Sequence, residues 1–330
     1  MDLMQILAAG VLATIGPVTA GYALSAIGLN LQFGYAGLLN FGHVASMLVG
    51  AYGTAMTVEF GGPLWLGLIV GVVAAVLLGL LLGLPTLRLR ADYFAITSIA
   101  AAEVLRLVVR SSWAEPLTGG VFGLQGFGRD FHALNPFPTS ELYGFGQFVV
   151  TGRALWVILV GWALVLLATL FIARLIKSPW GRVLKAIRED EDATRSLGRN
   201  VFAYKLQALM IGGGIASLAG ILFALEQQSI HPDAFQPRIT FLLFVMVILG
   251  GAGSIWGAVL GAAVFGFLFY ATDALMARLQ ANVDFVGAIF SPAEAGLIKY
   301  ILVGVALMLL MAFRPQGLLR SRDEGRADGS

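Results

Sequence analysis

The side chains that most often bind metals or carry out catalysis are scarce and widely spaced in this sequence. Its three histidines, His43, His132 and His231, lie far apart without metal-ligand spacing, and the chain contains no cysteine. The motifs HExxH, GxSxG and CxxC are absent. We therefore expect no metal site and no catalytic residues, so the chain is predicted not to be an enzyme.

Phosphate-binding loops are also missing. No GxxxxGK[ST] motif occurs. The run GGAGSIWG, from Gly250 to Gly257, lies between two apolar segments, and its last glycine is misplaced for the GxGxxG motif of dinucleotide-binding proteins. These absences favour a protein that moves a substrate over one that transforms it.

One stretch, GRVLKAIREDEDATRSLG from Gly181 to Gly198, places eight charged residues among eighteen. Ser178 and Pro179 provide a capping serine and a proline at the first helical position, and Gly198 can end the helix in a left-handed conformation. The pattern predicts a short amphipathic helix that can break near Asp190. Its apolar stripe consists of Val183, Ile187, Thr194 and Leu197.

Two explanations of this stretch remain open. A charged loop on the cytoplasmic side would account for the arginines and lysines. It would not account for the four consecutive acids, Glu189 to Asp192, or for the apolar stripe. A docking surface for a partner protein explains all three features, and we favour it.

Composition indicates whether the chain folds in water or in a membrane. The chain is 58% hydrophobic and 12% charged, whereas soluble domains contain roughly 25% charged residues. Apolar runs approach the roughly 20 residues that cross a bilayer as a helix, and they do not alternate as barrel strands would. The basic residues lie in loops without an aromatic platform, which argues against nucleic-acid binding. The fold class is therefore an all-α, polytopic membrane protein.

We expect about 8–10 transmembrane helices, some of them broken or re-entrant. Candidate runs cover residues 5–29, 40–58, 64–84, 93–110, 154–176, 202–224, 238–250, 255–275 and 297–313. Gly16-Pro17 can kink or divide the first run. Small residues four apart predict close helix packing, at Gly67 with Gly71, Gly79 with Gly83, Gly212 with Ala216 and Gly220, and Gly257 with Gly261.

Lysine and arginine set the expected orientation, because cytoplasmic loops of membrane proteins are enriched in them. Residues 85–92, 173–205 and 314–330 carry most of these side chains and are expected in the cytoplasm. Residues 111–153, 225–237 and 276–296 are then expected outside. The N-terminal apolar run lacks the features of a cleaved signal peptide. The side on which the N-terminus lies depends on whether Pro17 divides this run, so it stays open.

Several motifs in order resemble the permease subunits of branched-chain amino acid ABC importers of the LivM type. They are LRLRADYFAIT (87–97), LTGGVFGL (117–124), GRVLKAIREDEDATRSLG with NVFAYKLQAL (181–198 and 200–209), and VILGGAGSIWGAVLGA (247–262). The resemblance runs from about Tyr22 to Gly317. Urea-importer permeases belong to the same broad family.

The resemblance implies that residues 178–200 form the coupling loop that docks on a separate ATPase subunit. The residues assigned to this role are Gly181, Arg182, Lys185, Ile187, Arg188, Glu189, Asp190, Asp192, Ala193, Leu197 and Gly198. Asp192-Ala193-Thr194 followed by Gly198 is similar to a degenerate EAAxxxG pattern of ABC permeases. The implied partners are a second homologous permease, two ABC ATPase subunits that bind ATP-Mg, and an extracytoplasmic binding protein. No cofactor is expected on this chain.

Two glycine-broken segments are candidates for the substrate pathway, which in transporters often lies at interrupted helices near mid-membrane. The candidate residues are Asn30, Gln32, Asn40, His43, Gly250, Gly251 and Gly253. The alternative is that these segments are packing bends with satisfied polar groups. Glu103 and Arg106 lie three apart and are expected to form an ion pair, which we read as structural. The loops 111–153 and 231–235 either dock the binding protein or form a lid.

The expected function is import of branched-chain amino acids across the inner membrane of a bacterium by a multi-pass permease. Residues 1–316 would form the transmembrane domain and 317–330 a cytoplasmic polar tail. A urea or short-amide permease is the alternative within the family, and a self-sufficient channel or secondary transporter is the alternative outside it.

Overall fold

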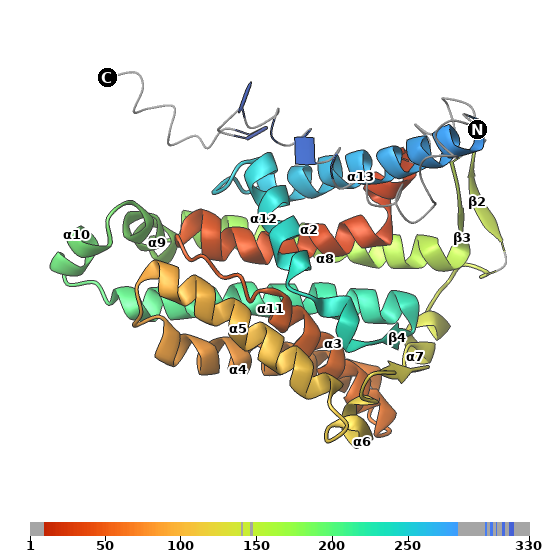
Figure 1. Cartoon of the computed structure of the whole chain (residues 1–330), viewed down its shortest axis with the longest axis horizontal. Helices are drawn as coiled ribbons and strands as arrows, with labels where there is room; N and C mark the ends of the chain where they lie inside the picture. Colours follow the sequence, from red (N-terminus) through yellow and green to blue (C-terminus); the bar gives the residue numbers. More distant parts are fainter. Residues whose placement is uncertain are drawn as a thin grey trace.

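The computed structural model describes residues 10–139, 141–145, 148–282 and scattered positions between 301 and 319. Long helices lie side by side in one bundle, and two short helices project beyond one end of it (Figure 1). The expected helix at 297–313 and loop at 276–296 fall largely outside the described residues. Residues 320–330 of the expected polar tail fall outside them entirely.

The described elements follow one another in this order: α2 (Pro17–Leu29), the π-helix η1 (Asn30–Tyr35), α3 (Val44–Glu59), α4 (Leu64–Thr86), α5 (Ala91–Arg110), α6 (Glu115–Thr118), β1 (Leu124–Gln125), α7 (Arg129–Ala133), β2 (Leu142–Phe145), β3 (Phe148–Thr151), α8 (Gly152–Lys177), α9 (Pro179–Glu189), α10 (Glu191–Ser196), α11 (Val201–Gln227), β4 (Ser229–Ile230), the 3-10 helix η2 (Pro232–Phe235), α12 (Arg238–Gly250) and α13 (Gly257–Asn282). A bend at Gly16 separates α2 from helical residues 10–15, which confirms the division of the first apolar run.

Five segments among the described residues are long and apolar enough to cross a membrane. They are α4, α8, α11, residues 232–250 including α12, and residues 257–276 of α13. The helices α2, α3 and α5 run through the same bundle beside them (Figure 1). An all-α polytopic membrane fold is therefore confirmed.

Small residues allow the central helix α11 to be surrounded closely. In its most apolar window α11 is 78% buried, whereas the corresponding window of α4 is 28% buried. The buried face of α4 consists mainly of Gly67, Gly71, Ala75, Gly79 and Gly83, spaced four apart as the sequence predicted. A Cβ on Gly79 would lie 3.2 Å from the backbone of Met210 in α11. Close backbone approach thus replaces the hydrophobic driving force that helices lack in lipid.

The opposite face of α4 carries large apolar side chains that are exposed in this chain. They are Trp65, Ile69, Val73, Leu77, Leu81 and Leu84. An apolar helix with small residues inward and large residues outward fits lipid on one side and protein on the other.

Two segments interrupt the bundle where the sequence predicted broken helices. The helix α2 continues into the π-helix η1, and irregular residues 36–43 follow before α3 begins at Val44. The helix α12 has only 13 residues, about 20 Å, which is shorter than the roughly 30 Å core of a bilayer. Residues 251–256 then connect it to α13.

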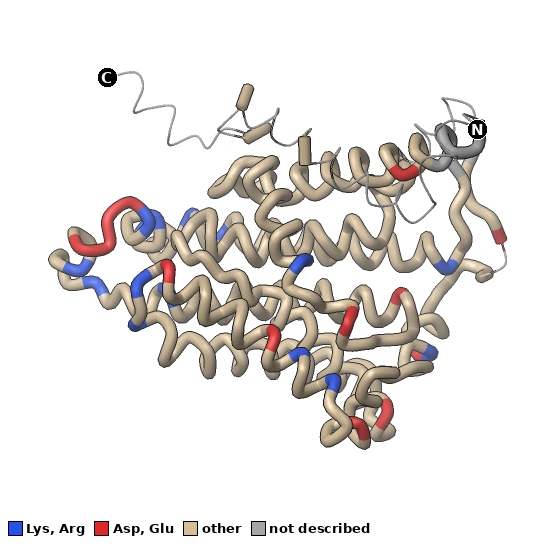
Figure 2. The backbone as a smooth tube through the Cα atoms, viewed as in Figure 1, with Lys and Arg blue, Asp and Glu red and all other residues tan. Residues whose placement is uncertain are grey.

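The two ends of the bundle differ in what they carry. The helices α9 and α10 and the loop that contains Arg88 and Arg90 lie at one end, which Figure 2 shows to be rich in charge. The other end carries α6, α7 and the strand pairs β1–β4 and β2–β3 (Figure 1). Two of the segments predicted to be cytoplasmic, 85–92 and 173–205, thus share one end, which we call the coupling end. Most of the third, 314–330, lies outside the described residues. We call the opposite end of the bundle the outer end.

Candidate functional site: the coupling segment and the broken helices

The coupling segment, residues 178–200, is two helices separated by one extended residue. Asp190 lies between α9 and α10, and its Oδ1 accepts a hydrogen bond of 2.9 Å from the amide of Ala193. Asp190 thereby caps α10, which explains the predicted break. Pro179 begins α9 as predicted. The capping role predicted for the Ser178 side chain is wrong, because its hydroxyl donates instead to the carbonyl of Leu175 in α8.

The apolar face of this segment does not form one outward stripe. Ile187 and Thr194 are buried against the chain itself, as are Gly181 and Leu184. They fix α9 and α10 to the bundle and cannot enter a partner's cleft. The predicted outward stripe is therefore wrong at Ile187 and Thr194, because both residues face the bundle and are covered by it.

The tip of the coupling segment is exposed. Leu197 is 82% exposed, a high value for a leucine. Gly198 follows it with φ +78°, the left-handed conformation that the sequence predicted, and no atom lies within 4 Å of the place where a Cβ would be. An exposed apolar residue beside a left-handed turn is suited to contact with another protein.

Ion pairs within the coupling segment hold α10 against α11. Glu191 accepts a bond of 2.9 Å from Arg195 and also pairs with Lys205 of α11, and Asp192 lies 3.0 Å from Arg195. Arg182 and Glu189 are exposed, Ala193 lies exposed in α10, and Lys185 is partly buried in α9.

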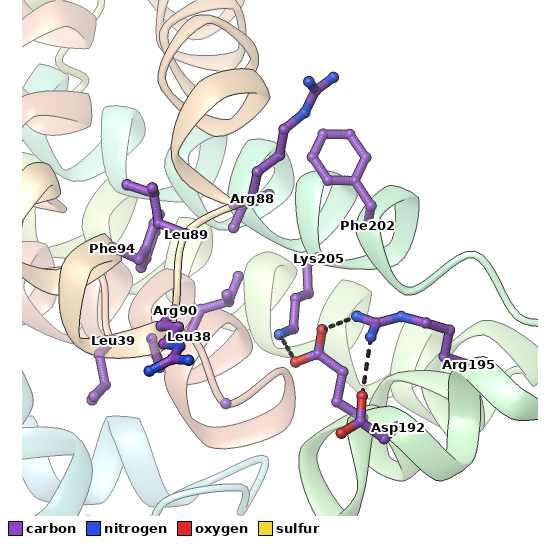
Figure 3. Close-up of a pocket in the computed structure, with 14 residues that line it drawn as sticks. Leu38, Leu39, Arg88, Leu89, Arg90, Phe94, Asp192, Arg195, Phe202 and Lys205 are labelled. Carbon is purple, nitrogen blue, oxygen red and sulfur yellow. Dashed lines mark hydrogen bonds and ion pairs between the residues drawn. The ribbon is translucent and has the colours of Figure 1, made fainter.

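A cavity of about 640 Å³ opens between α10, the start of α11 and the loop before α5 (Figure 3). Arg88 and Arg90 line this cavity from the loop before α5, and Glu191, Asp192 and Arg195 line it from α10. The guanidinium of Arg88 lies 6.0 Å from the ring centre of Phe202. The wall is completed by Gly37, Leu38 and Leu39 from the irregular residues after η1, so the cavity joins the coupling segment to a broken helix.

Arg188 of α9 reaches the same broken helix directly. Its Nη1 donates a hydrogen bond to the carbonyl oxygen of Gly34 in η1. A Cβ on Gly253, which has φ +79°, would lie 2.8 Å from that nitrogen. The coupling segment, η1 and the 251–256 loop therefore meet at one point, although the sequence separates them widely.

Asn30 joins the two broken segments to each other. Its Nδ2 donates to the carbonyl of Ser254 at 2.8 Å, and its Oδ1 accepts from the amide of Gly253 at 2.9 Å. Gly250 ends α12 and Gly251 has φ +106°. The carbonyls of Leu249 and Gly250 accept bonds from the amides of residues 318 and 319, so the chain after α13 returns to this end.

Gln32, Asn40 and His43 form a closed hydrogen-bond network in the bundle. The Oε1 of Gln32 accepts from Nδ2 of Asn40 at 3.0 Å and lies 3.1 Å from Nδ1 of His43. The remaining nitrogens reach the carbonyls of Leu209 and Ser25. In this conformation the three side chains are buried and each lies within hydrogen-bond distance of polar partners, as the packing alternative expects. A role in the pathway stays a prediction.

An ion cluster at the outer end extends the predicted pair of Glu103 and Arg106. The pair is present at 2.5 Å, and Arg106 also lies 2.5 Å from Asp233 in η2. Arg110 approaches Asp233 at 3.7 Å. The sequence did not predict the role of Asp233, a residue of the loop segment 231–235, because no local spacing relates it to α5. The cluster staples the outer loop to α5.

Long apolar helices, a small-residue interior and large apolar side chains outward define a multi-pass helical membrane protein. Residues 11–312 match the family described as branched-chain amino acid transport system / permease component, and the chain belongs to that family.

Curated relatives agree over most of the chain. A probable branched-chain amino acid transport permease protein LivM of Methanocaldococcus jannaschii is 28% identical over 90% of each chain. The high-affinity branched-chain amino acid transport system permease protein LivM of Escherichia coli is 32% identical, over 92% of this chain and 69% of its own length. The corresponding LivH protein of Escherichia coli is 26% identical, over 76% of this chain and 81% of its own.

Proposed function

We propose that this chain is a permease subunit of an ATP-binding cassette importer that carries branched-chain amino acids across the inner membrane of a bacterium. The observation that carries the proposal is the family match over residues 11–312, with relatives named for this transport. In this role the chain lines part of the translocation pathway and catalyses no reaction itself.

The proposed complex contains a second, homologous permease, two ATPase subunits and an extracytoplasmic binding protein. Similarity of this one chain to both LivM and LivH proteins supports pairing of two related permeases. ATP and Mg²⁺ bind on the ATPase subunits, since the sequence contains no phosphate-binding loop of its own. The exposed tip at Leu197 and Gly198 supplies the docking surface for one ATPase.

The test is uptake by purified complex in liposomes, driven by ATP and loaded binding protein. Radiolabelled leucine, isoleucine or valine should accumulate only with hydrolysable ATP. Accumulation of urea or a short amide in place of leucine would overturn the substrate. Uptake by the permease alone, without ATPase subunits, would indicate a channel or secondary transporter and overturn the whole proposal.

A further inference from the structure

The side chain of Arg188 lies in a notch made by glycines of both broken segments. Its guanidinium donates a hydrogen bond to the carbonyl of Gly34. The absence of a side chain at Gly253 makes room for the guanidinium, because a Cβ there would lie 2.8 Å from Nη1. The Cγ of Arg188 would lie 3.5 Å from a Cβ on Gly37, which is ordinary contact distance. A long side chain from the coupling segment therefore fits among backbone atoms of the two segments that interrupt the bundle.

The carbonyl that Arg188 binds belongs to a helix terminus. The run of α2 and η1 ends at Tyr35, and its final carbonyls have no partner in a further helical turn. Those of Leu31, Gln32 and Phe33 accept from nearby amides, whereas that of Gly34 accepts from Arg188. A cation is favoured at this end of a helix, and the charged donor strengthens the hydrogen bond. Arg188 thus completes the helix terminus from another element.

We propose that Arg188 is the positioning residue through which movement of α9 and α10 reaches the broken helices; the inference rests on the function proposed above. Displacement of α9 pulls the guanidinium from the Gly34 carbonyl and leaves the end of η1 without its partner. The same displacement shifts the 251–256 loop, because Asn30 bonds both to Gly253 and to Ser254. Both broken segments then rearrange together.

The hydrogen bond between Arg188 and Gly34 has the properties of a contact that can break and re-form. Gly34 offers a neutral carbonyl, so release of Arg188 leaves no buried carboxylate without its counter-charge. Arg188 is itself exposed in part, and its guanidinium gains water when it is released. The rival role for Arg188 is a direct contact with the ATPase, as for the exposed Arg182 on the same helix.

The experiment compares four complexes in lipid nanodiscs: the parent, Arg188→Met, Arg188→Lys and the matched control Arg174→Met, which replaces an exposed arginine of α8 outside the coupling segment. Methionine keeps a long side chain without a donor, and lysine restores a donor. Three quantities are measured: ATPase subunits retained on the permease, leucine uptake per ATP hydrolysed in liposomes, and amide hydrogen exchange of residues 33–43. The exchange is compared without nucleotide and with nucleotide trapped by vanadate.

In the parent, trapped nucleotide should change exchange across residues 33–43. Arg188→Met should retain its ATPase subunits but lose that change, and uptake per ATP should fall about tenfold, the effect of losing one charged hydrogen bond. Arg188→Lys should recover part of both quantities, and Arg174→Met should match the parent.

Two outcomes would overturn the inference alone. In the first, Arg188→Met keeps the parent's exchange response and uptake per ATP. In the second, it loses its ATPase subunits, which would make Arg188 a partner contact. Uptake by the parent without ATP hydrolysis would instead overturn the proposed function, and the inference with it.

Discussion

Arg106 at the outer end and Arg188 at the coupling end both join distant parts of the chain, but their partners differ. Arg106 is 9% exposed in its side chain and lies 2.5 Å from two carboxylates, those of Glu103 and Asp233. Arg188 is exposed and binds one neutral carbonyl, that of Gly34. A charge enclosed with its counter-charges is costly to separate, whereas a charge that returns to water is not.

This difference describes two ends with different tasks. At the outer end, Arg106 and Arg110 are held by acids of the same chain, so α5 and η2 are fastened together. At the coupling end, the tip leaves Leu197 82% exposed, and Asp192 is 91% exposed in its side chain despite its pair with Arg195. The charges of the outer ion cluster are paired within the chain, whereas the exposed tip of the coupling end is where we propose that a partner docks.

The largest expected effect concerns the sides of the membrane that the two ends face. The chain has no cysteine, so Ser112→Cys at the outer end and Ser196→Cys at the coupling end can be labelled singly. An impermeant maleimide added to intact cells should react with the first and not with the second, because basic loops stay in the cytoplasm. Labelling of Ser196→Cys alone would reverse the assignment of the two ends.

The next effect tests whether the outer cluster is a fixed staple. Arg106→Met should lower the free energy of unfolding by about 2.5 kcal/mol, because it removes charged hydrogen bonds to two carboxylates whose partial exposure lets water offset part of the loss. Denaturation in mixed micelles measures it. The control is Arg110→Met. The Arg110 side chain is 41% exposed and lies 3.7 Å from Asp233, so its loss should lower the free energy of unfolding by less than about 1 kcal/mol. Equal effects of the two variants would remove the contrast with the coupling end.

The smallest effect tests whether the coupling end meets a partner through its tip. Leu197→Asp should weaken ATPase binding by about 2 kcal/mol, roughly thirtyfold, because a charge would replace a central apolar contact. The dissociation constant of ATPase from permease in nanodiscs measures it. Arg195→Ala serves as control and should change binding by less than about 1 kcal/mol, since its ion pairs are exposed. Wild-type binding by Leu197→Asp would place the docking surface elsewhere.

Local sequence signals predicted the features that depend on neighbours along the chain. The break near Asp190, the left-handed Gly198 and the pair of Glu103 and Arg106 all follow from residues within one or two helical turns. The failures came where another element decides. Ser178 was expected to cap its own helix, but its hydroxyl donates to the carbonyl of Leu175 in α8 and accepts no bond from an amide of α9. Ile187 was assigned to a partner, but the bundle already covers it.

The sequence by itself determined that this chain is a helical membrane protein, because long apolar runs leave the backbone no other way to satisfy its hydrogen bonds in lipid. It also determined which helix faces are small enough for close packing, since spacing along a helix defines a face. Only the tertiary structure decided that Arg188 meets a carbonyl 154 residues away and that Arg106 meets an acid 127 residues away. Such pairs depend on how whole helices pack against one another, and no periodicity within either segment encodes that arrangement.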